Sequence, residues 1–220
     1  ITGHVQDILK MAEDNDATAG RALQEAGQLD TLALNLKDVG NVFKLGERGE
    51  QAMAVHGRMP AVAQKAAQDI ARTLEEAVRS GQIKLDDLFD QNYVPIPNTR
   101  PQKYTSKFDA LTDKIFPPVQ EPVLEGIPEV AYAGAVDVNG YFPTHNKRFS
   151  KPLTGDEKFD IANNRTKRIF NDPVGKKCGS HEQAFLLQTY RRDTGEIMHD
   201  LSVPIYVQDR HWGGFRLGYR

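Results

Sequence analysis

The stretch HDLSVPIYVQDRHWGGFRLGY, residues 199–219, decides the fold class of this chain. Two runs rich in β-branched and aromatic residues lie on either side of the polar segment 208–210, a pattern typical of antiparallel strands joined by a turn. A third apolar run precedes them, and Gly195 lies in the turn that follows it. The pattern therefore predicts three consecutive strands, over residues 185–191, 196–207 and 211–219.

A hairpin and a helix are predicted just upstream of these strands. The apolar run 130–136 leads to Asn139-Gly140, the strongest short hairpin signal, and a return strand would start at Tyr141. A helix is expected over residues 156–170. Two strands, a helix and three antiparallel strands predict an α+β domain, in which an antiparallel sheet packs against helices and a ligand can bind between the two.

The first 43 residues carry a heptad pattern. Small and apolar residues recur at alternating spacings of three and four, which predicts a long helix with a coiled-coil seam. A helix of about 40 residues would be roughly 60 Å long, and an ordinary amphipathic surface helix is the alternative. The seam positions are Val5, Ile8, Ala12, Asn15, Ala19, Ala22, Ala26, Leu29, Ala33, Leu36, Gly40 and Phe43.

Breaks in the pattern divide the chain into three parts. Gly46 and Gly49 are expected to end the coiled-coil helix, and a second helix would open at Pro60 and close at Gly81. Residues 91–103, rich in proline and asparagine, are expected to form a loop. We therefore expect a coiled-coil part over residues 1–46, a helical connector over 47–103 and the α+β domain over 104–220.

Residues 15–46, NDATAGRALQEAGQLDTLALNLKDVGNVFKLG, resemble the closing stretch of the signalling domain of methyl-accepting chemotaxis proteins. In that family a helical hairpin dimerises into a four-helix bundle, and its descending limb ends in a pattern like L-x-x-L-A-x-x-L-x-x-x-V-x-x-F-K. The matching residues are Leu29, Leu32, Ala33, Leu36, Val39 or Val42, Phe43 and Lys44. The resemblance implies a homodimer through the coiled coil and a chemotaxis kinase and adaptor as partners, bound by a hairpin tip that lies outside this sequence.

The segment VDVNGYFPTHN, residues 136–146, and the two closing strands resemble a PAS-like or Cache-type chemoreceptor sensor. The resemblance covers residues 104–220 and implies a small-molecule sensor for chemotaxis signal transduction, not an enzyme. Because this sensor follows the coiled coil in the sequence, we expect it to be cytoplasmic. Whether a membrane anchor lies upstream is left open. The single cysteine, Cys178, suits a reducing compartment.

Ten residues are candidates for ligand binding. The guanidinium fork of arginine suits a carboxylate or phosphate ligand. Polar residues on a strand can line a pocket if the sheet face on which they lie borders that pocket. Solvent-exposed polar faces are the alternative for each group. The candidates are Tyr141, His145, Asn146, Arg148, Asn164, Arg165, Arg168, Gln188, Tyr190 and His199. Asn164 and Arg168 would share a face of the predicted helix.

Cys178 and His181 have a C-x-x-H spacing that could serve a metal, although a site needs two more ligands. We expect no cofactor. The alternative is a haem or metal sensor of the same architecture that uses His145, Cys178, His181 or His199. A polar loop is the simplest interpretation of the pair, and a Cys-His hydrolase is the least favoured. Trp212, followed by Gly213-Gly214, is expected to be an aromatic anchor beside a bulge or a close approach of two backbones.

Composition narrows the classes of partner. The formal net charge is −2 and the isoelectric point is near 6.3, so no basic surface indicates a nucleic-acid partner. No run approaches the roughly 18 apolar residues of a membrane span.

Overall fold

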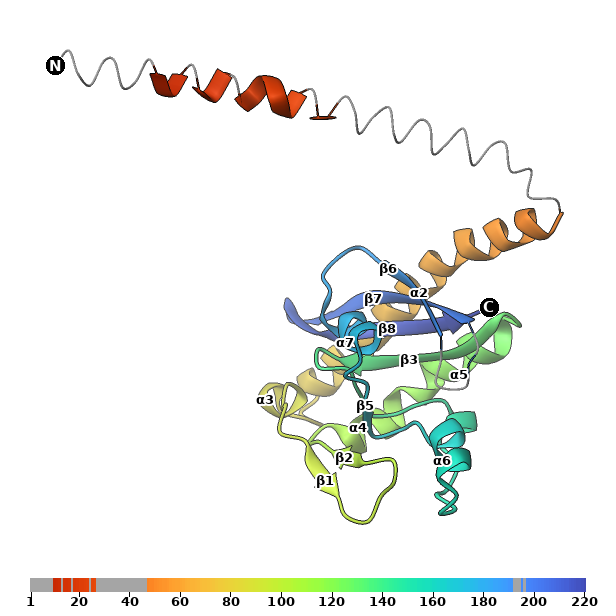
Figure 1. Ribbon diagram of the computed structural model, residues 1–220. Coiled ribbons are helices and arrows are strands. Elements are labelled where there is room, and N and C mark those ends of the chain that lie inside the picture. Colours follow the sequence, from red (N-terminus) through yellow and green to blue (C-terminus); the bar gives the residue numbers. More distant parts are fainter. Residues whose placement is uncertain are drawn as a thin grey trace. The chain divides into compact units, whose positions relative to one another are not determined.

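The computed structural model of the chain describes residues 10–12, 14–16, 18–23, 25–26, 47–191, 195 and 197–220 (Figure 1). The chain divides into two units, Ile1–Met53 and Ala54–Arg220. The described residues up to position 26 are helical and exposed, which confirms the helix predicted there. They include the seam positions Ala12, Asn15, Ala19, Ala22 and Ala26. The other seam positions lie outside the described residues, so the coiled coil stays a prediction.

Helix α2, Glu47–Arg79, runs through Pro60 without a break. The predicted helix start at Pro60 is therefore wrong, and α2 already includes Gly49. Proline lacks one backbone donor, but a helix survives that loss where packing outweighs it, and α2 buries a continuous apolar face. That face contains Met59, Ala63, Ala66, Ala67, Ile70, Leu74 and Ala77. The predicted end is confirmed, because Gly81 adopts φ +73° and the Gln82 amide donates to the Ala77 carbonyl.

Short elements connect α2 to the main sheet. They are α3 (Leu85–Leu88), β1 (Val94–Ile96), β2 (Lys103–Thr105), α4 (Asp109–Ile115) and α5 (Pro117–Gly126). Strands β1 and β2 pair antiparallel, so the stretch 91–103, expected to be a loop, contains part of a small sheet. The prolines and asparagines of this stretch correctly indicated the turn between β1 and β2. They also disfavoured strands in the pattern, so the two strands themselves were not predicted.

The main sheet is antiparallel and confirms the α+β prediction. Its strands are β3 (Val130–Asp137), β6 (Leu186–Arg191), β7 (Ile197–Val207) and β8 (Arg210–Tyr219), in the order β3-β8-β7-β6. The three closing strands were predicted within one residue of their bounds. Val203 lies opposite Phe215 across β7 and β8, and Phe215 lies opposite Ala135 on β3.

The predicted return strand does not pair with β3. Strand β4, Tyr141–Phe142, instead pairs with β5, Arg168–Ile169. The turn itself forms, with the Gly140 amide donating to the Asp137 carbonyl at 3.0 Å, and Gly140 has φ +77°. A Cβ on Gly140 would strike the Phe170 carbonyl, so only glycine lets the chain cross here toward the β5 region instead of returning along β3.

The helix predicted over 156–170 is shorter than expected. Helix α6 spans Glu157–Asn163, and Asp156 caps it by accepting the amides of Lys158 and Phe159. Lys167 has φ +59°, which a helix cannot accommodate, and the Arg165 amide donates to the Phe149 carbonyl at 2.6 Å. Asn164 and Arg168 therefore do not share a helix face. Helix α7, Pro173–Ser180, follows β5.

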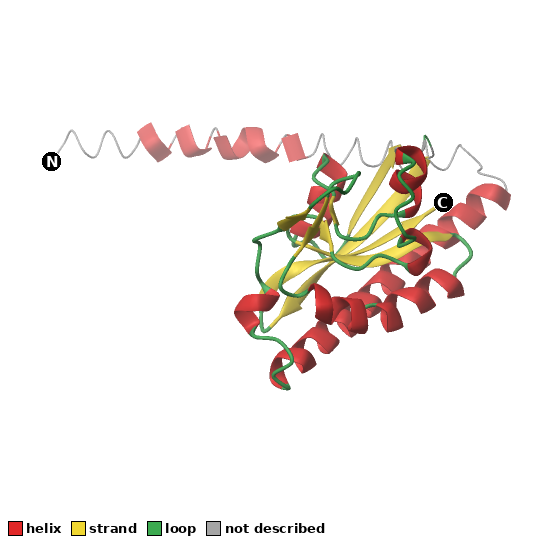
Figure 2. Cartoon of the chain, turned by 90° about the horizontal axis from the view of Figure 1, so that it is seen from below, coloured by secondary structure: helices red, strands yellow, loops and turns green. Residues whose placement is uncertain are grey.

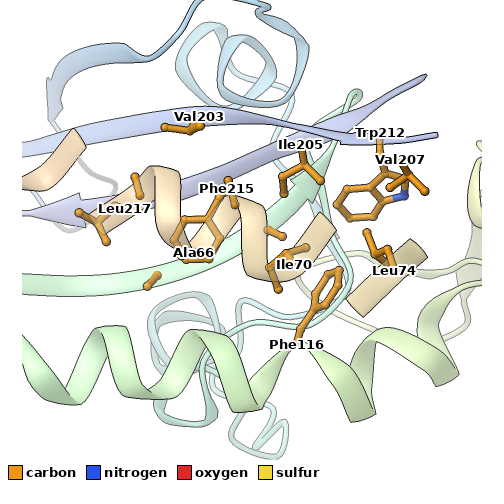
Figure 3. Packing of buried hydrophobic residues seen from close by; sticks show 14 of the residues in the cluster. Ala66, Ile70, Leu74, Phe116, Val203, Ile205, Val207, Trp212, Phe215 and Leu217 are labelled. Carbon is orange, nitrogen blue, oxygen red and sulfur yellow. The ribbon is translucent and has the colours of Figure 1, made fainter. Parts of the chain in front are cut away.

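The core lies between α2 and one face of the sheet (Figure 3). It includes Ala66, Ile70, Leu74, Val203, Ile205, Phe215 and Leu217. Figure 2 shows the long helices packed along that face, and α7 packs on the opposite face of β7 and β8. The indole of Trp212 donates to the Leu88 carbonyl at 3.0 Å. A Cβ on Gly213 or Gly214 would strike a neighbouring backbone carbonyl, which confirms the predicted aromatic anchor and close approach.

Candidate anion-binding pocket

A pocket of about 340 Å³ opens on the sheet face opposite α2. The alternation along β8 fixes this placement, because Phe215 and Leu217 belong to the core against α2 and Arg216 between them points to the other face. Strands β4 and β5 and the start of α7 complete the walls. The described lining residues are Tyr132, Phe142, His145, Arg165, Arg168, Phe170, Asp172, Tyr190, Arg191 and Arg216. We call this the arginine pocket.

A buried ion pair forms the floor of the arginine pocket. Arg216 Nη2 donates to Asp200 Oδ2 at 2.5 Å, and the Tyr132 hydroxyl donates to the same oxygen at 2.5 Å. The side chains meet because Asp200 on β7 and Tyr132 on β3 both lie opposite Gly218 of β8. Asp200 is fully buried and Arg216 is 5% exposed. A desolvated pair with this many hydrogen bonds holds one guanidinium in a fixed position.

The electrostatics of the floor keep Arg216 charged. Burial alone would lower the pKa of Arg216, but the charge of Asp200, its hydrogen bond and the neighbouring Cys178 and Tyr132 together outweigh burial and hold that pKa well above its ordinary value. Burial raises the pKa of Tyr132, so its hydroxyl stays a proton donor. Arg216 Nε is buried and finds no hydrogen-bond partner within the described residues. An unpaired buried donor costs about 1–3 kcal/mol, and a ligand oxygen could supply the acceptor.

Three guanidinium groups surround the ring of Phe170. The Cζ atoms of Arg165, Arg168 and Arg216 lie 5.3, 5.0 and 5.9 Å from the centroid of that ring. Arg165 follows the end of α6, and Arg168 begins β5 directly after the turn at Lys167, so both reach the same ring. Arg191, at the end of β6, adds a fourth arginine to the lining. Positive charge is therefore concentrated around one aromatic ring.

The remaining wall is aromatic and polar. The rings of Phe142 and His145 stack with centroids 4.1 Å apart. The backbone amide of Asn146 donates to Nδ1 of His145 at 2.8 Å. Because Nδ1 is the acceptor, the proton of a neutral His145 ring lies on Nε2. The hydroxyl of Tyr190 lies 3.2 Å from that of Tyr132.

Asp172 is the only acidic residue among the described residues that line the pocket. Its Oδ1 accepts the amides of Val174 and Gly175 at 3.1 Å each, so the carboxylate caps the start of α7. This carboxylate is thus engaged with the helix that it starts.

The arginine pocket brings together four of the ten predicted ligand contacts. They are His145, Arg165, Arg168 and Tyr190. They come from the loop after β4, from the segment around β5 and from β6, so they are distant in sequence. Their roles in ligand binding stay predictions.

Three candidates near the turn after β3 do not line this pocket. The hydroxyl of Tyr141 hydrogen bonds to the carboxylate of Asp109 at 3.0 Å, and its ring is buried in the core. Asn146 Oδ1 accepts the Ala133 amide at 2.9 Å and so ties its loop to β3. Arg148 is exposed, with its guanidinium 5.0 Å from the ring of Phe149.

Three further candidates also lie away from the lining. Asn164 directly follows α6 as its C-cap, and its side-chain amide donates to the Lys151 carbonyl at 2.6 Å. Gln188 shares the sheet face of Tyr190, as alternation predicts, but its amide donates to the Val174 carbonyl at 3.2 Å. His199 points to the other face of the sheet, where the centroid of its ring lies 4.6 Å from the ring centroid of His56 on α2.

Cys178 lies on α7 and His181 directly follows that helix, and both side chains contact residues of β7. The Cys178 thiol contacts Asp200 Oδ1 at 3.5 Å, and His181 Nε2 lies 2.9 Å from the Ser202 hydroxyl. In the part of the chain that the structure describes, no three His, Cys, Asp or Glu side chains are grouped so that they could hold a metal ion. The haem or metal interpretation remains an untested prediction.

Six lining residues were missed by the sequence reasoning: Tyr132, Phe142, Phe170, Asp172, Arg191 and Arg216. One of them carried a usable signal. Arg216 is a lone charged residue inside an apolar strand, and a charge in such a place is buried only when it is paired. The other five look like ordinary strand, turn or capping residues in the sequence.

The comparisons with known proteins add little to this geometry. No family model matches the sequence, and no curated protein matches it. Among solved structures, the chain is similar to an extracellular ligand binding receptor from Desulfohalobium retbaense DSM5692, with 12% identity, a TM-score of 0.33 and 74% of this chain covered. The match covers 25% of the length of that receptor. A likeness at this level carries no functional argument. None of the helices described here is both long and apolar enough to cross a membrane.

Proposed function

We propose that residues 54–220 form a PAS/Cache-like sensor domain that binds a small organic anion in the arginine pocket. The observation that carries this proposal is the set of four arginines lining one pocket of about 340 Å³, with a single acidic residue in the described lining. Pockets for small molecules typically start near 300 Å³ and combine apolar walls with a few convergent polar groups. Arginine forks match the geometry of a carboxylate.

We propose binding without chemical conversion. The nucleophile nearest to the pocket floor is Cys178, and burial raises the pKa of its thiol to about 12. A thiol of this kind is inert at neutral pH, because the thiolate is the reactive form. The floor groups Arg216 and Asp200 are held by each other, which suits a binding site whose shape is fixed before the ligand arrives.

Strand β8 offers a route by which binding could reach α2. Arg216 lines the pocket, and its neighbours Phe215 and Leu217 pack in the core against α2. Because Asp200 holds Arg216, a ligand that pulls on Arg216 would move β7 and β8 together and so favour one packing of α2 over another. In the sequence, α2 follows the heptad segment, and we propose that a homodimer formed through that segment carries the signal to a chemotaxis kinase and adaptor in the cytoplasm.

Isothermal titration calorimetry of the whole chain against small carboxylates and phosphates tests the proposal. At least one anion should bind the wild type, and Arg168→Ala should weaken it at least tenfold. Arg148→Ala is the matched control, because Arg148 is exposed and lies outside the lining. Binding that is absent for every anion, or equally weakened by both variants, would contradict the proposal.

A further inference from the structure

We propose that Lys167 is a positioning residue of the arginine pocket, which holds Arg165 and Arg168 in place without touching the ligand. The inference rests on the proposed function, because it assigns how that pocket keeps its shape. Lys167 is not among the described residues that line the pocket, yet it lies between two arginines that are. The basis is the backbone conformation of Lys167 and the contacts of its ammonium group with α4.

The backbone of Lys167 adopts a conformation in which lysine is uncommon. Its φ of +59° lies in the left-handed region, where a residue with a Cβ is strained and glycine or asparagine is usual. Neighbouring strands hold the residue in this state. Its amide donates to the Phe142 carbonyl of β4 at 2.7 Å, and its carbonyl accepts the Tyr104 amide of β2 at 2.8 Å. A glycine would form this turn with less strain, so the presence of lysine indicates that its side chain is used.

The side chain of Lys167 binds two aspartates of α4. Its Nζ lies 3.0 and 2.9 Å from the two carboxylate oxygens of Asp113 and 3.3 Å from Oδ2 of Asp109. The side chain of Lys167 is 17% exposed and that of Asp109 is 10% exposed, so water and salt screen this contact less than a surface pair. Asp109 is fixed in turn by the Tyr141 hydroxyl, which donates to it at 3.0 Å. The ammonium group is therefore held at a defined point on α4.

Asp113 joins a second segment of the pocket wall to the same point. The Thr144 hydroxyl donates to Oδ1 of Asp113 at 2.6 Å. The next residue, His145, lines the pocket and stacks on Phe142, which also lines it. One carboxylate of α4 therefore binds both the turn between the wall arginines and the loop that carries His145.

The turn at Lys167 lies between the two wall arginines. Residues three apart on a continuous strand would point to opposite faces, whereas Nη1 of Arg165 and Nη1 of Arg168 both donate to the Ile161 carbonyl, at 3.4 and 3.3 Å. Both guanidinium groups also lie beside the ring of Phe170. If the Lys167 side chain is released from α4, the turn can relax and the two guanidinium groups can separate. An anion would then have to order the wall itself, at a cost in affinity.

Isothermal titration calorimetry of the whole chain tests the role of Lys167. Acetate, lactate, succinate, citrate and inorganic phosphate are titrated first, and the anion that the wild type binds most tightly serves as the probe. Lys167→Met should weaken binding of the probe at least fivefold, because the turn loses its anchor. Lys167→Arg should bind within twofold of the wild type, because a guanidinium fork can still pair with the aspartates of α4. Wild-type affinity in Lys167→Met, or no recovery in Lys167→Arg, would overturn the inference.

Asp113→Ala separates positioning from simple charge. Lys167→Met also leaves the aspartates of α4 without their cation, and their field alone would repel an anion. Asp113→Ala removes a negative charge, so the field alone would make binding tighter, whereas loss of the anchor should weaken it at least threefold. Glu157→Ala is the control, since it removes an exposed carboxylate of α6 and leaves the Lys167 contacts in place; it should bind within twofold of the wild type. Tighter binding by Asp113→Ala would overturn the inference.

Lys167→Gly separates positioning from stability. It removes the anchor but relieves the left-handed strain, so it should resist urea at least as well as Lys167→Met while binding the probe no more tightly. Wild-type affinity in Lys167→Gly would overturn the inference.

Hydrogen exchange of the Tyr104 amide, which donates to the Lys167 carbonyl, needs no ligand. This exchange should be at least fivefold faster in Lys167→Met than in the wild type. The Val138 amide, which donates to the Trp212 carbonyl, is the internal control and should not change. Unchanged exchange at Tyr104 would overturn the inference and leave the proposed function standing. Faster exchange in a chain whose wild type binds no anion of the panel would overturn the proposed function and leave the anchor standing.

Discussion

Replacing Asp200 by alanine should destabilise the domain strongly, because it leaves the charge of Arg216 buried without its partner. Arg216 is 5% exposed and Asp200 is fully buried. Breaking such a pair costs about 3–5 kcal/mol, a large share of the roughly 5–15 kcal/mol that holds a typical domain together. The Tyr132 hydroxyl also loses its acceptor in this variant, so we expect the upper part of the range.

Urea unfolding followed by tryptophan fluorescence measures this loss, since Trp212 is the single tryptophan of the chain and is buried in the core. The double variant Asp200→Leu/Arg216→Met should recover most of the stability, because apolar residues of similar volume often replace a buried pair at no cost. Asp69→Ala is the control. Asp69 pairs with Lys65 and Arg72 on the exposed side of α2, and exposed pairs contribute about 0–1 kcal/mol.

The reasoning about the pocket floor would be refuted if Asp200→Ala unfolded at the urea concentration of the wild type. It would equally be refuted if the double variant were no more stable than the single one, because the cost would then not come from an unpaired charge.

Three other predictions follow from buried groups. Burial raises the pKa of Asp137 to about 6, above the ordinary value of about 3.9, so the folded state holds this proton more tightly than the unfolded state. The free energy of unfolding should fall by up to ~3 kcal/mol between about pH 4 and 6; urea unfolding of Asp137→Asn should lack this component, and identical pH profiles would contradict the assignment. Because burial raises the pKa of Cys178 to about 12, its reaction with a thiol reagent at pH 8 should be roughly 1,000-fold slower in the native than in the unfolded protein, and similar rates would refute it. Ile70→Ala, at a fully buried position of α2, should cost about 2–5 kcal/mol in urea unfolding, and a loss below about 1 kcal/mol would show that α2 is not packed as described.

The sequence predicted the strands well where local pattern decides the structure. The runs that became β7 and β8 are rich in β-branched and aromatic residues and have a short polar turn between them, so their bounds followed from the residues alone. Long-range packing was harder to foresee. Asn139-Gly140 did form a turn, but the partner of β4 depends on Gly140 meeting Phe170, which lies thirty residues later and leaves no trace in the hairpin pattern.

The prediction of the pocket residues shows the same difference between local pattern and long-range packing. Arg165 and Arg168 were chosen as cations of one predicted helix, which ends before both of them, yet the chain around Lys167 places both beside Phe170. Arg216 could not be ranked as a site from the sequence because its pairing with Asp200 requires the register of β7 on β8. Residue type indicated arginines as candidate anion ligands, and only the fold could show which of them line one pocket.

A crystal structure of the whole chain with the small organic anion that it binds most tightly tests the central claim most directly. The claim predicts the negative group of the ligand inside the arginine pocket, within hydrogen-bond distance of at least one of its lining arginines. Density for the ligand at another site, or an arginine pocket that holds only water at saturating ligand, would contradict it.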